Sequence, residues 1–133
     1  MKILLVEDDI MLNEMITEYI TSTGHVIKNA KTGLESLEIL ENEKFDLLIL
    51  DINLPDIDGF TILEKMHEQK RMIPTIYISA LIDIEEISRA FDLGCFDYLK
   101  KPFHLKELTL RINKILKTRI VPQRHKRLSK HYS

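Results

Sequence analysis

The sequence of 133 residues contains a single cysteine, and it has no apolar stretch that approaches the length of a membrane span. One cysteine, Cys95, cannot form a disulfide within the chain, which fits the reducing conditions of a cytoplasm. Met1 leads directly into an apolar strand pattern, without the layout of a signal peptide. Internal repeats and low-complexity segments are absent as well. We therefore expect a cytoplasmic protein with no membrane partner.

Acidic residues are missing from the end of the chain. Residues 119–133 carry five basic residues, namely Arg119, Arg124, Lys126, Arg127 and Lys130. Subtracting their charge of +5 from the net charge of -2 leaves -7 for residues 1–118. An acidic domain is a poor candidate for binding nucleic acid by itself. We expect one domain over residues 1–118, followed at 119–133 by a basic linker or by the start of a missing effector domain.

Short, nearly continuous apolar runs predict strands that are buried on both faces. These runs are Ile3–Val6, Leu47–Leu50 and Thr75–Ile78, and His25–Ala30 and Phe96–Lys100 are weaker strand patterns. Between the runs, apolar residues recur at the spacing of an amphipathic helix. They are Leu12, Met15, Ile16, Tyr19 and Ile20; Leu34, Leu37 and Leu40; Phe60, Leu63 and Met66; Ile84, Ile87 and Phe91; and Leu105, Leu108, Ile112 and Ile115. This alternation predicts a parallel sheet with helices on both faces.

Glycine and aspartate residues mark where several of these helices begin or end. Gly24 and Gly94 follow helical patterns at the place of a left-handed C-terminal cap. Asp58-Gly59 closes the loop before the third helix. Asp9 stands where the side chain of an N-terminal cap is expected, just before the first helix. These residues therefore predict some of the helix ends as well as the helices.

Polar residues follow four of the predicted strands. Glu7 and Asp8 follow the first, Asp51 and Ser79 end the two central apolar runs, and Lys101 follows the last. Because ligands bind at the carboxyl ends of parallel strands, we expect these side chains to meet. A carboxylate can attack phosphorus to form an acyl phosphate, and Mg²⁺ commonly takes carboxylates together with phosphate oxygens as ligands. The pattern predicts an acidic, magnesium-binding phosphoryl site, with a lysine as a second cation.

Each signal has an ordinary explanation when it is taken alone. The acidic run at Glu7, Asp8 and Asp9 also suits a helix N-terminus. A serine or an aspartate at a strand end often bonds only to a nearby turn. The five histidines show no ligand spacing, and Cys95 fits a small apolar packing residue better than a reactive one. The agreement of separate segments favours the site.

The segments together resemble the response regulator receiver domain, the phosphoacceptor half of a two-component system. The likeness covers residues 2 to about 118 and rests on Leu5-Val6-Glu7-Asp8-Asp9, Leu50-Asp51-Ile52-Asn53-Leu54-Pro55, Asp58-Gly59, Ile78-Ser79-Ala80 and Asp97-Tyr98-Leu99-Lys100-Lys101-Pro102-Phe103. It implies an α/β, flavodoxin-like doubly wound (βα)5 fold with a five-stranded parallel sheet in the strand order 2-1-3-4-5.

The resemblance implies a role for each acidic residue. Asp51 matches the aspartate that accepts a phosphoryl group from a sensor histidine kinase. Glu7 and Asp8 match the acidic pair, of which Asp8 is the direct ligand of Mg²⁺. Asn53 matches the position whose backbone carbonyl also binds the ion. The expected metal site is therefore Glu7, Asp8, Asp51 and Asn53, with Mg²⁺ as the cofactor.

The resemblance also implies a switch. Lys101 matches the lysine that contacts the phosphoryl group, and its peptide bond to Pro102 is a candidate for the cis form. Ser79 matches the hydroxyl that moves toward the phosphoryl group, and Tyr98 the aromatic ring that then turns inward. The domain catalyses only its own phosphorylation and dephosphorylation, which shift a pre-existing equilibrium. The face made by the fourth helix, the fifth strand and the fifth helix carries the output.

The segment from Phe103 to Leu108, with Arg111 after it, resembles the subgroup fused to a winged-helix DNA-binding domain. In that subgroup an active homodimer is held by ion pairs across the output face, and Asp97, Glu107 and Arg111 fall at matching places. Ile87 stands where a basic partner is common, which leaves that part of the ion-pair network open; Arg89 is a candidate to substitute for it. DNA is expected as a partner only through the missing C-terminal domain, with control of transcription as the output.

Three other functions remain to be weighed. A phosphatase with an aspartate nucleophile requires a second acidic residue two positions after the nucleophile, where this chain has Asn53. A flavin or nucleotide carrier wants a loop rich in Gly, Ser or Thr after the first strand, and an acidic run there repels phosphate. A degenerate or stand-alone receiver that acts only through protein contacts stays open, although all the acceptor residues are present.

Overall fold

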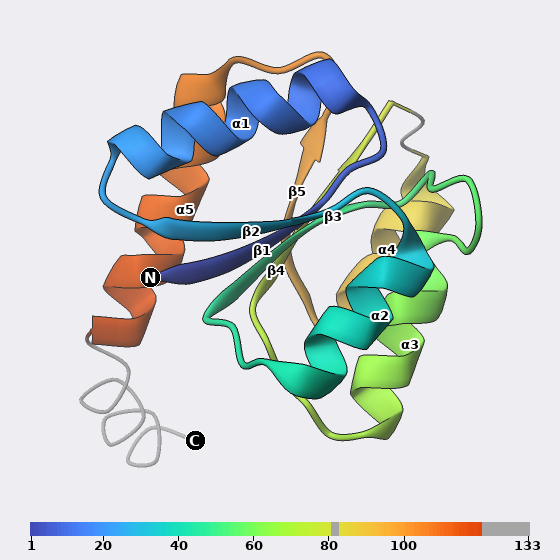
Figure 1. The fold of residues 1–133 in the computed structure, drawn as a ribbon. Helices are drawn as coiled ribbons and strands as arrows, with labels where there is room; N and C mark the ends of the chain where they lie inside the picture. The colour runs from blue at the N-terminus through green and yellow to red at the C-terminus, as the bar shows by residue number, and fades with distance from the viewer. Residues whose placement is uncertain (81–82, 121–133) are drawn as a thin grey trace. The chain divides into compact units, whose positions relative to one another are not determined.

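The computed structural model describes residues 1–80 and 83–120, and it divides the chain into two compact units, residues 1–103 and residues from His104 onward. Most of the predicted linker at 119–133 lies outside the described residues. In chain order the elements are β1 (Lys2–Val6), α1 (Ile10–Ser22), β2 (Val26–Ala30), α2 (Gly33–Asn42), β3 (Leu47–Asp51), α3 (Gly59–Glu68), β4 (Thr75–Ser79), α4 (Ile84–Asp92), β5 (Cys95–Lys100) and α5 (Leu105–Ile120) (Figure 1). None of the described helices is long and apolar enough to cross a bilayer.

The five strands form one parallel sheet in the order β2-β1-β3-β4-β5, which confirms the predicted fold. Every residue of β3 and β4 is buried, as the continuous apolar runs predict, whereas β2 at one edge is mostly exposed. The register pairs Asp51 with Ile78, so the ends of β3 and β4 lie side by side. Strand pairing therefore brings the polar residues that follow the strands to one edge.

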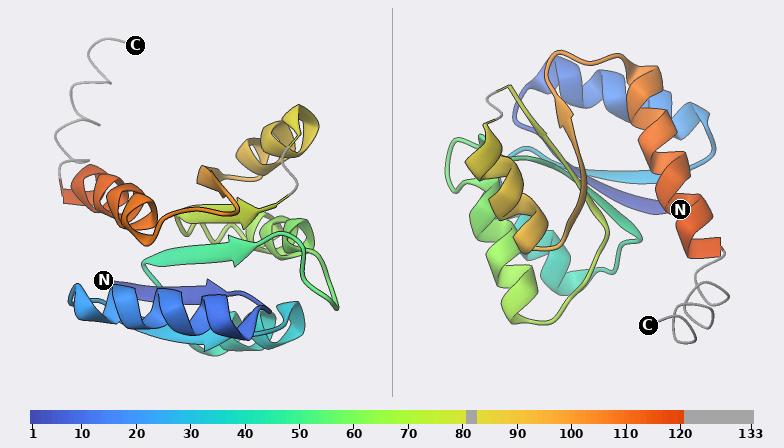
Figure 2. Two further views of the ribbon diagram at one scale, coloured as in Figure 1. Left: turned by 90° about the horizontal axis from the view of Figure 1, so that it is seen from above. Right: turned by 180° about the vertical axis from the view of Figure 1, so that it is seen from behind.

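Helices of the first unit cover both faces of the sheet. Helix α1 lies on one face, and α2, α3 and α4 lie on the other (Figures 1 and 2). On the face of the three helices, the core joins Leu40 of α2, Phe60 and Leu63 of α3, and Ala90 of α4 to the strands. In the second unit, α5 carries the predicted apolar residues at three- and four-residue spacing.

Side-chain caps fix the starts of four helices. The N-cap side chains of Asp9, Thr32, Asp58 and Asp83 each accept a hydrogen bond from a backbone N–H three residues later. This satisfies N–H groups that have no partner within the helix. Helices α1 and α3 follow the loops from the carboxyl ends of β1 and β3, so their caps also hold the loops that carry Glu7, Asp8 and Asn53.

Helix α4 forms at the predicted segment, but part of its apolar stripe is exposed to solvent. Ala90 is the buried residue of this helix, while Ile84 is 82% exposed and Phe91 is 45% exposed. Ala90 contacts the core, and Ile87 is half-buried. The helix presents an apolar face to its surroundings.

Candidate functional site

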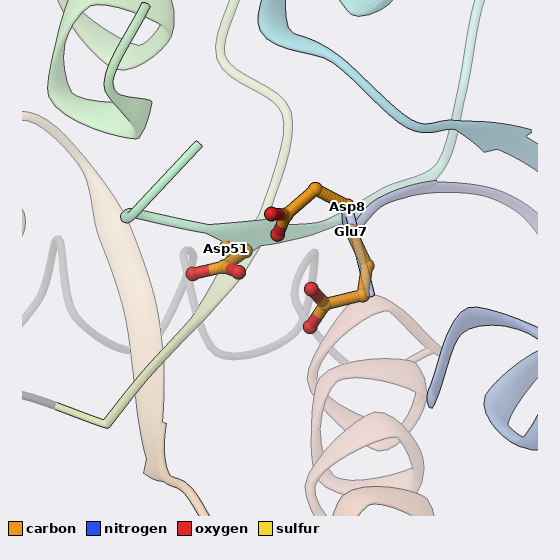
Figure 3. A group of neighbouring side chains, drawn as sticks. All are labelled: Glu7, Asp8 and Asp51. Atoms are coloured by element: carbon orange, nitrogen blue, oxygen red, sulfur yellow. The ribbon is translucent and has the colours of Figure 1, made fainter. Parts of the chain in front are cut away.

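Three carboxylates lie together at the carboxyl edge of the sheet. Asp51 is the last residue of β3, and Glu7 and Asp8 follow β1 directly. Oxygen atoms of the three lie within 4.8 Å of one another, and Figure 3 shows their side chains meeting from the ends of the two strands. Glu7 and Asp51 are buried, and Asp8 is exposed. The structure thus brings together the three acidic residues that the sequence places at separate strand ends.

Both oxygens of the Asp51 carboxylate are held in place. Oδ1 accepts a hydrogen bond of 2.9 Å from the backbone N–H of Asn53, and Oδ2 accepts one of 3.0 Å from Lys101 Nζ. The residue is only 2% exposed, so water contributes little to its solvation. A buried carboxylate that accepts charged and backbone donors is fixed in one orientation.

Lys101 bridges two of the carboxylates. Its Nζ lies 2.7 Å from Glu7 Oε1 and 3.0 Å from Asp51 Oδ2. Burial alone would lower the pKa of Lys101, but the ion pairs with Glu7 and Asp51 outweigh it and raise the pKa above its ordinary value. The peptide bond to Pro102 is cis, as the sequence led us to consider, and Lys101 N donates to Ser79 O at 2.9 Å. The lysine is therefore a fixed cation at neutral pH.

The ionised form of Glu7 is electrostatically unfavourable in this group. Burial, together with the nearby charge of Asp51, raises the pKa of Glu7 to about 7, although Lys101 opposes the shift. Oε2 accepts a hydrogen bond of 3.1 Å from Asp9 N, whereas Oε1 meets Lys101 as an ion pair without the direction of a hydrogen bond. One lysine thus compensates incompletely for the two buried carboxylates and the exposed Asp8.

This donor set fits a hard divalent cation. Carboxylate oxygens are the ligands that Mg²⁺ prefers, and the ion commonly takes one or two carboxylates together with phosphate oxygens. The excess negative charge around Glu7 and Asp51 is the electrostatic condition that a divalent cation relieves. The acidic group is therefore a candidate magnesium site.

Ser79 and Asn53 lie beside this group. Ser79 ends β4 with its side chain buried, and its Oγ accepts a hydrogen bond of 3.0 Å from Asn53 Nδ2. The side chain of Asn53, to which the sequence analysis assigned no contact, therefore links the residues after Asp51 to β4. Sequence reasoning also missed Asn13, whose Nδ2 donates to Glu7 O at 3.0 Å. The sequence feature that could have indicated Asn13 is a polar residue on the buried side of α1, three residues before Ile16.

Tyr98 belongs to an aromatic row. Its ring centroid lies 6.2 Å from that of Tyr77 on β4 and 6.3 Å from that of Phe91 on α4. Tyr77 also neighbours Phe60 of α3 at 6.4 Å. Tyr98 is half-buried, so it lies between the core and the open face of α4. The row connects β4, where Ser79 lies, with β5 and α4.

The residues expected at a dimer face have partners within the chain. Asp97 is 9% exposed, and its Oδ1 accepts a hydrogen bond of 2.9 Å from Tyr98 N. Glu107 Oε1 and Arg111 Nη2 lie 3.5 Å apart, one turn apart on α5. Arg89 does not stand free to substitute for a basic residue at position 87, because its guanidinium pairs with Glu64 of α3 at 2.5 Å and lies 4.4 Å from the centre of the Phe60 ring.

Comparison with known proteins identifies the family of the chain. The family model described as the response regulator receiver domain matches residues 3–113. The probable transcriptional regulatory protein SilR of Salmonella typhimurium is 38% identical over 117 residues, which cover 88% of this chain and 51% of that protein. The transcriptional regulatory protein CrdR of Helicobacter pylori is 39% identical over 114 residues, covering 85% and 54%. The chain therefore spans about half the length of these relatives.

A solved structure gives the same result for the fold. The non-phosphorylated HemR receiver domain from Leptospira biflexa superposes with a TM-score of 0.81 at 35% identity, covering 86% of this chain and 92% of that one. The strand order is 2-1-3-4-5, as the sequence resemblance implied. An acidic group lies at the ends of β1 and β3, with a lysine beside it. With a family match over most of its length, the chain belongs to the response regulator receiver domains.

Proposed function

We propose that this receiver domain accepts a phosphoryl group on Asp51 from a sensor histidine kinase. The observation that supports it most is the setting of Asp51, a buried carboxylate held by Asn53 N–H and Lys101 beside Glu7 and Asp8. A carboxylate oxygen of Asp51 attacks phosphorus, the P–N bond of the phosphohistidine breaks, and the imidazole leaves with the electron pair of that bond. Phosphoryl transfer depends chiefly on such alignment and on charge neutralisation.

The residues around Asp51 divide the remaining work. Lys101 supplies a fixed positive charge for the phosphoryl oxygens, because its Nζ already lies 3.0 Å from the acceptor carboxylate. When Mg²⁺ is bound, held by Glu7, Asp8, Asp51 and the carbonyl of Asn53, it adds neutralising charge for the transfer. Asn53 offers no carboxylate as general acid, and its amide donates to Ser79. The domain is thus proposed to serve as a phosphoacceptor that catalyses its own modification, and not as a phosphatase of other substrates.

The output is proposed to follow from Ser79 and Tyr98. In this proposal the hydrogen bond from Asn53 Nδ2 to Ser79 Oγ breaks, and the Ser79 hydroxyl donates to an oxygen of the new phosphoryl group instead. The ring of Tyr98 then turns inward from the aromatic row. The face of α4, β5 and α5 then favours binding a second copy of the chain. In that homodimer Asp97, Glu107 and Arg111 pair with residues of the second copy in place of their present partners. The relatives are named as transcriptional regulators, so transcriptional control through a DNA-binding domain outside this chain, in the cytoplasm, is the proposed end of the pathway.

Native mass spectrometry with Mg²⁺ and acetyl phosphate tests this proposal, because it reads the phosphoryl adduct and the oligomer together. We expect one adduct on the parent chain, none on Asp51→Asn, and one on the matched surface control Asp92→Asn. A dimer that appears only with the adduct would support the proposed output. No adduct on the parent chain would mean a degenerate receiver, and steady release of phosphate from small phosphate esters would mean a phosphatase.

A further inference from the structure

The loop between β3 and α3, residues 52–58, is tied to the N-terminus of α2 by Asp56. Its Oδ1 accepts a hydrogen bond of 2.8 Å from Gly33 N, and its Oδ2 accepts another of 2.8 Å from Leu34 N. These are the first two N–H groups of α2, which have no acceptor within the helix. One exposed carboxylate thus joins two segments more than twenty residues apart in the sequence.

The donors act on the charge of Asp56 as well as on its position. The backbone N–H groups of Leu34 and Gly33 lower the pKa of the Asp56 carboxyl below its ordinary value. The carboxylate therefore stays ionised at neutral pH and keeps both of its bonds. A negative charge at the start of a helix is also favoured by the helix dipole.

Close packing accompanies the polar contact. A Cβ at Gly33 would lie 2.3 Å from Ile57 Cγ1 and 3.2 Å from Ile57 O, so the backbone of α2 meets the loop directly. Ile57 in turn packs against the core of the sheet. The loop is therefore held by two hydrogen bonds to the Asp56 carboxylate and by the close packing of Ile57 against Gly33.

The other end of the loop is held at the phosphoryl site. Asn53 N donates to Asp51 Oδ1, and Asn53 Nδ2 donates to Ser79 Oγ. Gly59 N donates to Ile52 O at 2.8 Å, which closes the loop on itself. Asn53, which is exposed, stands only three residues before Asp56. The path of the backbone at Asn53 is thus set from both sides, by β4 on one and by α2 on the other.

We propose that Asp56 is a positioning residue for the metal site, because its bonds to α2 hold the Asn53 backbone carbonyl where Mg²⁺ is to bind. This inference rests on the proposed function, in which that carbonyl is a ligand. Both carboxylate oxygens of Asp56 accept bonds from α2, so Asp56 is not proposed as a ligand of the ion. Its contribution is to keep the loop in one conformation before the ion arrives, so that binding need not order it.

Isothermal titration calorimetry of the full chain with Mg²⁺ tests the inference. Asp56→Ala should raise the Kd for Mg²⁺ about tenfold, at the lower end of the effect of removing a supporting partner of a ligand. Asp56→Asn should stay within about threefold of the parent, because its amide oxygen still accepts a helix N–H. With acetyl phosphate, Asp56→Ala should need more Mg²⁺ for half-maximal phosphorylation, yet reach nearly the same rate at saturation.

Thr32→Ala is the matched control. It removes the hydrogen bond of 3.1 Å from Glu35 N to Thr32 Oγ1 at the same end of α2 and leaves the loop untouched. It should lower the melting temperature to a similar extent as Asp56→Ala while the Kd stays at the parent value. If Asp56→Ala melts below the assay temperature, Asp56→Ser, whose short side chain loses both bonds to α2, should still raise the Kd about tenfold.

The outcomes separate this inference from the proposed function. A parent chain that binds Mg²⁺ normally, together with an Asp56→Ala variant of equal Kd, would overturn the positioning role alone. An equal loss of affinity in Thr32→Ala would also overturn it, because general weakening of α2 would then be the cause. A parent chain that takes up no Mg²⁺ would overturn the metal site itself, and the positioning role with it.

Discussion

Replacing Glu7 by glutamine should make the metal-free protein more stable at neutral and alkaline pH. Burial, with the charge of Asp51, raises the pKa of Glu7 from 4.5 to about 7, despite the opposing charge of Lys101. Because the folded-state pKa lies above the unfolded value, the parent loses stability as pH rises from about 4.5 to about 7, and the full cost is present above that range. At about 1.4 kcal/mol for each unit, the cost is about 3 kcal/mol.

Urea denaturation followed by circular dichroism, with a chelator present, measures this difference. At pH 5 Glu7→Gln and the parent should differ little, and at pH 8 the variant should be more stable by about 3 kcal/mol. Saturating Mg²⁺ should narrow the gap, because the cation stabilises the parent more. Glu14→Gln, an exposed change on α1, serves as the control and should show no such pH dependence. A difference between Glu7→Gln and the parent that is equal at both pH values would refute the reasoning.

Three further outcomes are expected. Mg²⁺ at a hundredfold its Kd should stabilise the folded protein by about 2.7 kcal/mol and raise its melting temperature, and melting that ignores Mg²⁺ would count against the acidic site. Lys101→Ala, which leaves Glu7 and Asp51 without their cation, should cost about 3 kcal/mol at pH 8 without metal and slow adduct formation; a variant that is phosphorylated and dimerises normally would remove the lysine from the mechanism. Gly33→Ala, whose methyl group would overlap Ile57, should cost about 1–3 kcal/mol in urea melts, and parent-like stability would show that the loop can give way.

The fold could be predicted because burial on both faces leaves a continuous apolar signature. Strands β3 and β4, buried at every residue, were found within one residue of their ends, and the edge strand β2 gave only a weak pattern because most of it is exposed. The convergence of Glu7, Asp8 and Asp51 followed from topology alone, since parallel strands that pair in register end at one edge. The family resemblance supplied the chemical roles, which geometry by itself does not assign.

What escaped the sequence analysis depends on single contacts between distant segments. The bonds of Asp56 to α2, the pairing of Arg89 with Glu64, and the donation from Asn13 to Glu7 O have no periodicity and no motif of their own. In each case the partner of a polar side chain depends on how two separate elements pack, which the sequence pattern does not show. Such contacts set the precise path of loops, and their residues look like ordinary surface or cap residues until the fold is known.

The open face of α4 has a consequence for the order in which the first unit unfolds locally. Since Ala90 is the buried residue of that helix, while Ile87 is half-buried and Phe91 meets Tyr98 edge-on, separating its turns from the sheet exposes less apolar area than opening the fully buried β3 does. Opening α4 should therefore cost far less free energy than opening β3, and its amide hydrogens should exchange with deuterium well before those of Leu47–Asp51. An element that opens so readily can be repositioned by an event worth only a few kcal/mol, such as the arrival of one charged group at the neighbouring strand ends.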